Sequence, residues 1–239
     1  MKALAPALLL LAFLASARAN ALTVDATANI FGAAHSTPPA PGGGGGGELP
    51  PVFMFSPGGG QSVMFSNVTG SVNANDTQST FTNGPDGAGP AGSTTSTNLN
   101  SVGGISGIVD DSNSFFLVGV FVSASEPQDP APSPLDFSSS ALGENFSTLS
   151  PQLNQTFFIG DGLTGHGTGA TQVFNVPATA TRLFIGFADG AFFTGDPGNY
   201  SDNSGSLSVT VNIVPEPSCI SLVGIGVLLL RRKRAAIRK

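Results

Sequence analysis

The sequence predicts an all-β fold, a β-sandwich of jelly-roll type, from three observations. Apolar and polar residues alternate with a period of two in several short segments, and no segment shows the 3.6-residue period of an amphipathic helix. Turn-forming Gly, Pro, Asn, Asp and Ser separate these segments at the intervals typical of a sandwich. Phe occurs 18 times and Trp is absent, so Phe is expected to supply most of the aromatic core.

Seven segments are expected to form strands. In 21–30, Leu22, Val24 and Ala26 alternate with polar residues, and in 62–72, Val63, Phe65 and Val68 lie in a similar pattern. The continuous apolar run over 115–123 is typical of a central strand buried on both faces. The last strand, 206–213, again alternates, with Leu207, Val209 and Val211 on one face. The remaining expected strands are 156–159, 171–176 and 182–188.

Two segments are expected to be loops because of their composition. Residues 36–51 include six consecutive glycines, Gly42 to Gly47, and residues 77–104 are rich in Gly, Ser, Thr and Asn. The glycine run lacks the Lys-Ser/Thr pair and the strand-to-helix context of a phosphate-binding loop. It is therefore interpreted as a flexible surface loop.

The N-terminus has the features of an export signal. Met1-Lys2 is positively charged, 4–15 are apolar, and the small-x-small sequences at 17–19 and 19–21 suit a signal peptidase. We expect a signal peptide over 1–21 and a mature chain that begins near Asn20 or Leu22.

The C-terminal segment 214–239 combines three features in order. Val214, Pro215, Glu216 and Pro217 precede an uncharged membrane segment of 13 residues, Ser218 to Leu230, and a basic cluster then follows: Arg231, Arg232, Lys233 and Arg234. A spanning helix needs about 20 apolar residues, so this short helix would cross a bilayer only marginally. The basic cluster should stay on the cytoplasmic side as an anchor.

This arrangement resembles the bacterial PEP-CTERM sorting signal. The resemblance implies that an exosortase-type transpeptidase is a partner, that the protein is anchored transiently in the membrane, and that its destination is the cell surface or the extracellular matrix. The alternative is an ordinary C-terminal anchor that is never processed.

Between the two ends, residues 22–213 form one expected domain with an unusual charge balance. Fourteen of the 15 acidic residues lie between 22 and 214, whereas Arg182 is the only basic residue there, so the net charge is near 1 − 14 = −13. Nucleic-acid binding depends on Lys and Arg, which excludes that class of partner. The only cysteine, Cys219, lies in the tail, so the domain is stabilised without a disulfide.

Oxygen-bearing residues gather between the last two expected strands. Asp189 ends one strand, Asp202 and Asn203 precede the next, and the segment between them is rich in Gly, Pro and Asn. Calcium takes six to eight oxygen ligands from such side chains and from backbone carbonyls. The alternative is that these residues only form turns.

The sequence from Ala188-Asp189 through 197–206 resembles the C-terminal part of the calcium-dependent, galactose-binding bacterial lectin fold. The resemblance implies that calcium is held by Asp189, the carbonyl of Asn199, Asp202 and Asn203, with another carbonyl near Asn73 or Ala74, and that carbohydrate completes the shell. The His and Gln that hold the sugar in that family have no identifiable counterpart, since His35 and His166 lie in turn-like surroundings. Phe192 and Phe193, in a longer loop, either stack on a sugar or cap the core.

Enzymatic activity is not expected. Neither histidine lies in a nucleophile motif, and Asp110 and Asp111, as neighbours on a strand, should point to opposite faces and form no dyad. The sequence thus predicts an exported, calcium-binding protein that binds carbohydrate or is associated with exopolysaccharide. The alternatives are a purely structural matrix protein and, less favoured, an ice-binding or glycan-degrading protein.

Overall fold

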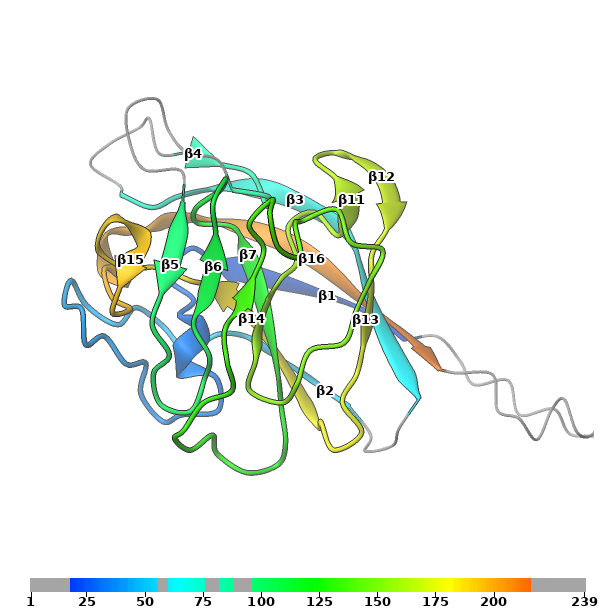
Figure 1. The fold of residues 1–239 in the computed structure, drawn as a ribbon, viewed down its shortest axis with the longest axis horizontal. Helices are drawn as coiled ribbons and strands as arrows, with labels where there is room; N and C mark the ends of the chain where they lie inside the picture. Colours follow the sequence, from blue (N-terminus) through cyan, green and yellow to red (C-terminus); the bar gives the residue numbers. More distant parts are fainter. Residues whose placement is uncertain (1–17, 56–59, 76–81, 88–95, 216–239) are drawn as a thin grey trace, which may run out of the picture.

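The computed structural model describes residues 18–55, 60–75, 82–87 and 96–215 (Figure 1). Within these ranges the chain is all-β, and helical structure is confined to short 3-10 turns, among them η1 (Ile30–Gly32), η3 (Ala191–Phe193) and η4 (Tyr200–Asp202). The predicted all-β class is therefore confirmed, and the several sheets are consistent with a sandwich.

The largest sheet has the order β1-β16-β3-β13-β9, with β4 added beside β3. Its strands are β1 (Arg18–Asp25), β16 (Ser204–Pro215), β3 (Gln61–Asn73), β13 (Val173–Asn175), β9 (Thr148–Leu149) and β4 (Thr82–Asn83). A second sheet has the order β10-β7-β14-β2. It contains β10 (Thr156–Phe158), β7 (Leu117–Val122), β14 (Arg182–Phe187) and β2 (Val52–Met54).

Two smaller sheets complete the domain. One has the order β15-β5-β6-β8, formed by β15 (Thr194–Gly195), β5 (Thr97–Leu99), β6 (Ile108–Asp110) and β8 (Leu135–Asp136). The other is the hairpin of β11 (Leu163–Gly165) and β12 (Thr168–Thr171), which projects from the body beside β3 (Figure 1).

Phenylalanine rings join the two larger sheets into one core. Phe157 of β10 contacts Phe121 of β7 and Phe174 of β13, with ring centroids 5.1 Å apart in both pairs. Phe174 in turn meets the edge of Phe65 on β3, at 5.2 Å. All four rings are buried, and aromatic pairs of this kind contribute about 0.5–1.5 kcal/mol each beyond area burial. The prediction that Phe supplies the aromatic core is confirmed.

The long predicted strands are found, with shifted ends. The run 115–123 contains β7, which is buried on both faces and lies between β10 and β14. The segment 206–213 lies within β16, where Leu207, Val209 and Val211 are fully buried while Ser208 is exposed. The first segment is an exception, because β1 ends at Asp25 and the chain then turns towards η1. The expected strand 171–176 is divided between the end of β12 and β13, and the prediction of 77–104 as a loop is wrong where β4 and β5 form.

The pairing register of β16 shows which residues lie at each end of the large sheet. At one end Arg18 pairs with Ile213 and Pro215 pairs with Gln61; at the other, Ser204 pairs with Asn73. A strand rises about 3.3 Å per residue, so the 12 residues of β16 separate these ends by roughly 36 Å. Residues 18 and 215 therefore lie at the end remote from the 189–204 segment.

The predicted terminal signals fall mostly outside the described residues. Strand β1 begins at Arg18, so the expected signal peptide 1–21 overlaps its first four residues, and Val214 and Pro215 of the sorting motif are the last residues of β16. Glu216, Pro217, the membrane segment and the basic cluster lie outside. Among the described residues, no helix is long and apolar enough to span a membrane.

Candidate functional site

Asp189 is a buried carboxyl group just past the end of β14, and only 2 % of the residue is exposed. Its Oδ1 accepts a hydrogen bond from the backbone N–H of Gly190 at 2.7 Å, and its Oδ2 accepts one from Asn203 Nδ2 at 2.8 Å. Burial raises the pKa of Asp189 to about 7 despite these hydrogen bonds, and the nearby charge of Asp202 raises it further. The buried environment thus disfavours the charged carboxylate unless a positive partner is present.

The hydroxyl of Tyr200 holds the backbone of Asp189 in place. Its ring is fully buried, and its hydroxyl donates to the carbonyl oxygen of Phe187 at 3.0 Å while accepting from the backbone N–H of Asp189, also at 3.0 Å. Burial, followed by the Asp189 charge, raises the pKa of Tyr200 well above its usual value of 10. The hydroxyl therefore satisfies two backbone groups at the point where β14 ends.

The side-chain amide of Asn203 links the Asp189 carboxylate to the backbone just after β1. Its Nδ2 donates to Asp189 Oδ2 and also to the carbonyl oxygen of Ala26, at 3.2 Å. Its Oδ1 is buried and accepts no hydrogen bond from any described residue. A buried oxygen without a donor costs about 1–3 kcal/mol, and a bound cation would offset this cost.

The other predicted ligands lie in the same region, with differing roles. Asp202 ends the turn η4 and is close enough to Asp189 to affect its pKa. Asn199 precedes η4 in a left-handed conformation, with φ 65°, which leaves its carbonyl within the turn. The β3 register places Asn73 opposite Ser204, so the predicted early segment at Asn73 and Ala74 adjoins Asn203.

The glycine run lies on the surface as predicted, but it is also packed against this turn. The N–H of Asn199 donates to Gly43 O at 2.9 Å, and the N–H of Tyr200 donates to Gly45 O at 3.2 Å. A Cβ on Gly47 would collide with the carbonyl oxygen of Thr27 and lie 2.6 Å from Tyr200 Cβ. The run is a close-fitting cover for the 197–201 turn, which a purely compositional interpretation as a flexible loop missed.

The oxygens gathered here fit a hard cation in part. Calcium accepts carboxylate, amide and backbone oxygens, and this region offers Asp189, Asp202, Asn203 Oδ1 and the Ala26 carbonyl. In the described ranges, no three His, Cys, Asp or Glu side chains are grouped so that they could hold a metal. Any ion here would therefore depend on amide and carbonyl oxygens alongside two carboxylates.

The two aromatics of the 190–195 loop behave differently. Phe193 is buried and its ring lies 6.3 Å from that of Phe115, so it caps the core. Phe192 is 81 % exposed, with φ 55°. The core-capping alternative is therefore found at Phe193, whereas Phe192 is exposed and its stacking on a sugar stays a prediction.

A second polar cluster, which the sequence did not reveal, surrounds Glu144. Glu144 Oε2 pairs with His166 Nε2 at 2.7 Å, and its Oε1 accepts from Asn113 Nδ2 at 2.6 Å. Asp110, fully buried, faces the same carboxylate through Oδ2, which receives no N–H or O–H donor from the described residues. Burial first, and then the neighbouring Glu144 carboxyl group, raise the pKa of Asp110 to about 7.

The two histidines and the acidic pair at 110–111 lie largely as the sequence predicts, but both histidines have acidic partners. His166 lies in the turn between β11 and β12, as its surroundings predicted, but it also pairs with Glu144, and the resulting hydrogen bond raises its pKa. Asp110 is buried whereas Asp111 is exposed, so the two carboxylates separate as expected. His35 pairs with Glu126 at 2.8 Å. The acidic partners of both histidines are remote in sequence and carry no local signal.

Searches against protein-family models, curated proteins and solved structures found no match to this chain.

Proposed function

We propose that this is an exported protein of the cell surface or extracellular matrix, that it binds calcium at Asp189, Asp202, Asn203 and the Asn199 turn, and that it is associated with exopolysaccharide. The observation that carries the calcium proposal is Asn203. Its buried Oδ1 lacks a donor while its amide also contacts Asp189, so an oxygen with no positive partner lies beside a buried carboxylate.

The resemblances in the sequence support the remaining parts of this proposal. The PEP-CTERM-like tail supports export and processing by an exosortase-type enzyme, and the lectin-like segment supports carbohydrate binding near the ion. The role is non-enzymatic: the bound ion would hold the 189–203 segment in one conformation and supply open coordination positions to sugar hydroxyls.

The competing function is a structural matrix protein that binds no ion. The hydrogen bonds favour it to a degree, because Gly190 and Asn203 already satisfy both oxygens of Asp189. In that case the Asn203 side chain, without an ion, links Asp189 after β14 to Ala26 after β1.

Thermal unfolding of the full-length protein with calcium and with chelator separates the two functions. Calcium binding predicts that calcium raises the free energy of unfolding by about 2.7 kcal/mol at 100 times the Kd, and the melting temperature should rise accordingly with calcium concentration. Asp202→Asn, which keeps the size but removes the charge, should abolish most of this increase. Asp136→Asn, an equally conservative change at an exposed acid at the end of β8, should retain it. Identical melting curves with calcium and chelator would contradict calcium binding.

Mass spectrometry of the surface fraction tests the sorting proposal separately. Processing predicts a C-terminus near Pro217. A surface protein that still ends at Lys239 would support the uncleaved anchor instead.

A further inference from the structure

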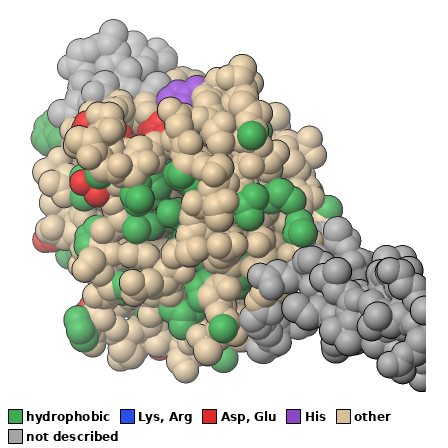
Figure 2. All heavy atoms as spheres, turned by 45° about the vertical axis from the view of Figure 1, so that its right-hand side comes forward, with side chains coloured by type: hydrophobic (Ala, Val, Ile, Leu, Met, Phe, Trp, Pro, Cys, Tyr) green, Lys and Arg blue, Asp and Glu red, His purple; other side chains and the backbone are tan. Residues whose placement is uncertain are grey.

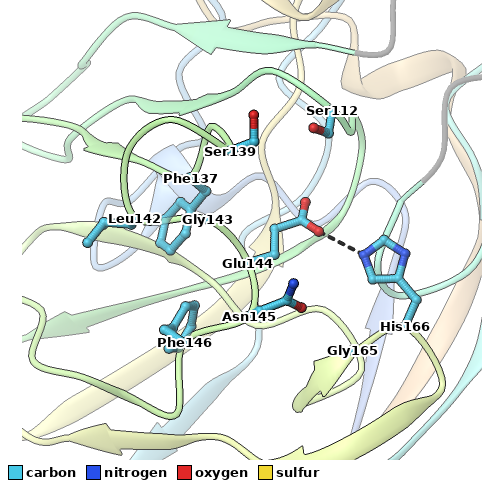
Figure 3. A pocket seen from close by; sticks show the side chains of 10 residues that line it. All are labelled: Ser112, Phe137, Ser139, Leu142, Gly143, Glu144, Asn145, Phe146, Gly165 and His166. Carbon is cyan, nitrogen blue, oxygen red and sulfur yellow. Dashed lines mark hydrogen bonds and ion pairs between the residues drawn. The ribbon is translucent and has the colours of Figure 1, made fainter.

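A hollow of about 640 Å³ lies beside Glu144, and none of its lining residues belongs to the calcium proposal (Figure 3). Small-molecule sites in proteins measure about 300–1,000 Å³ and combine apolar walls with a few placed polar groups. Here the apolar wall is formed by Phe137, Phe146 and Leu142, and the polar wall by Glu144, Asn145 and His166, with hydroxyl groups above.

Glu144 is held rigidly in this hollow. Asn113 and His166 each bind one of its carboxylate oxygens, while Gln172 Nε2 donates to its backbone carbonyl at 2.7 Å. Gln172 is itself fully buried. A carboxylate held at both oxygens, on a backbone that is itself held, keeps its remaining lone pairs in a constant position, which lowers the entropic cost of binding a hydroxyl group.

Two serine hydroxyls are fixed in the same way. Ser112 Oγ and Ser139 Oγ both donate to the carboxylate of Asp111, each at 2.9 Å. Their donors are thus used, and their oxygens remain as acceptors. Among the described residues, no hydrogen bond engages the exposed side-chain amide of Asn145, which offers both donors and an acceptor.

The apolar wall suits the C–H face of a sugar ring. Leu142 is 46 % exposed, and Phe146 is only partly buried while packing on Phe137 at 5.8 Å. A monosaccharide has an apolar face and a rim of hydroxyls, and this hollow offers an apolar surface bordered by fixed acceptors and one free amide.

The charge near the hollow selects among saccharides. Asp86 and Asp161 both act on the charge of His166, and Asp110 and Asp111 adjoin Glu144 and the two serines. Three carboxyl groups, Glu144 included, thus act on His166, and two more adjoin Glu144 and the serines. The face drawn in Figure 2 shows acidic side chains but no Lys or Arg among its coloured atoms. A ligand with its own carboxylate would be repelled here.

We infer that the hollow between the Leu142–Phe146 loop and His166 binds a saccharide unit without acidic groups, independently of calcium. Glu144, Asn145 and the two serines bind its hydroxyls, and Leu142 with Phe146 packs against its ring.

The test is binding of the full-length protein to an array of oligosaccharides in excess chelator. The probes are neutral hexose oligomers, glucosamine oligomers and galacturonic acid oligomers. We expect binding to neutral or glucosamine oligomers and at least tenfold weaker binding to galacturonic acid oligomers. Absence of binding to every probe, or equal binding of the acidic probe, would overturn the inference.

Two variants locate the binding. Asn145→Ala, at an exposed position, should weaken it by about 2- to 10-fold, and Glu144→Gln by about 10-fold or more, since hydrogen bonds to charged groups are stronger. Asn98→Ala, a matched exposed change on β5, should have less than a twofold effect. Binding that requires calcium and tolerates both hollow variants would overturn this inference while supporting the proposed function. Binding in chelator that both variants weaken would support this inference, even if calcium fails to raise the melting temperature and the proposed calcium site is thereby contradicted.

Discussion

Tyr200→Phe tests whether the phenol hydroxyl, rather than the packing of the ring, secures the end of β14. The substitution keeps the buried ring and removes one oxygen atom. That oxygen is the acceptor for the Asp189 N–H and the donor to Phe187 O, both at 3.0 Å. Because Tyr200 is fully buried, water is not expected to replace it easily.

The magnitude follows from the two groups left unsatisfied. A buried donor or acceptor without a partner costs about 1–3 kcal/mol, so two such groups should lower the free energy of unfolding by about 2–4 kcal/mol once some relaxation is allowed. For a domain of about 190 residues, each kcal/mol shifts the melting temperature by about 2–4 °C. The expected decrease is therefore roughly 4–16 °C.

Urea denaturation and thermal melting of both proteins measure this effect. The slope of the unfolding free energy against urea should stay unchanged, because the surface exposed on unfolding is the same. Ser208→Ala removes an exposed hydroxyl and should change the free energy by less than about 0.5 kcal/mol. A Tyr200→Phe protein as stable as the wild type would refute the assigned role of the hydroxyl.

Two further predictions concern the glycine run and the buried acid. Gly47→Ala places a methyl group against Thr27 O and Tyr200, whereas the methyl group of Gly43→Ala, at a similar positive φ, meets nothing within 4 Å. Denaturation should show that Gly47→Ala is less stable than Gly43→Ala by about 1–3 kcal/mol. Equal stabilities would refute the close fit of the glycine run. Asp110 has a pKa raised from 3.8 to about 7, so its contribution to stability is present below about pH 4 and lost as pH rises to 7. Asp110→Asn should therefore gain stability relative to the wild type across this window. Asp111→Asn, at an exposed carboxylate whose pKa is lowered, should show no such gain, and parallel profiles for Asp110→Asn and the wild type would contradict the burial argument.

Sequence patterns predicted the elements that are stabilised mainly by burial. The apolar run of β7 and the alternation in β16 depend on which side chains face the core, and that information is local. Strands β5, β6 and β15 are two or three residues long, and β15 pairs in parallel with β5, almost 100 residues earlier in the chain. Such strands form because a remote partner is available, so local composition does not reveal them.

The two candidate sites differ, for the same reason, in how well the sequence predicts them. Asp189 and Asn203 are 14 residues apart and flank one turn, so their convergence follows from the turn itself. The Glu144 cluster depends on contacts with Asn113, 31 residues away, and with His166, 22 residues away. The glycine run likewise has its partner turn some 150 residues later, and its composition alone predicts only a loop.

The position of the proposed calcium site is compatible with the proposed attachment through the C-terminus. Residues 213–215 and Arg18 lie at one end of the large sheet, and Asn203 lies at the other, about 36 Å away along β16. A chain held through residue 215, whether by its own membrane segment or by a product of processing, would present the 189–203 segment away from the point of attachment. The 189–203 segment would face away from the attachment point whether the tail is processed or left uncleaved.

The charge of the domain links the two proposed sites to different glycans. With a net charge near −13 over 22–214, the domain repels an anionic polysaccharide, and a divalent cation shared between Asp189, Asp202 and the glycan would offset that repulsion. The hollow at Glu144 has no such cation and selects sugars without acidic groups. Binding of the full-length protein to anionic polysaccharide should therefore require calcium, whereas binding to neutral oligomers should persist in chelator. Calcium-independent binding of the anionic polymer would show that neither site, as described, accounts for attachment to the matrix.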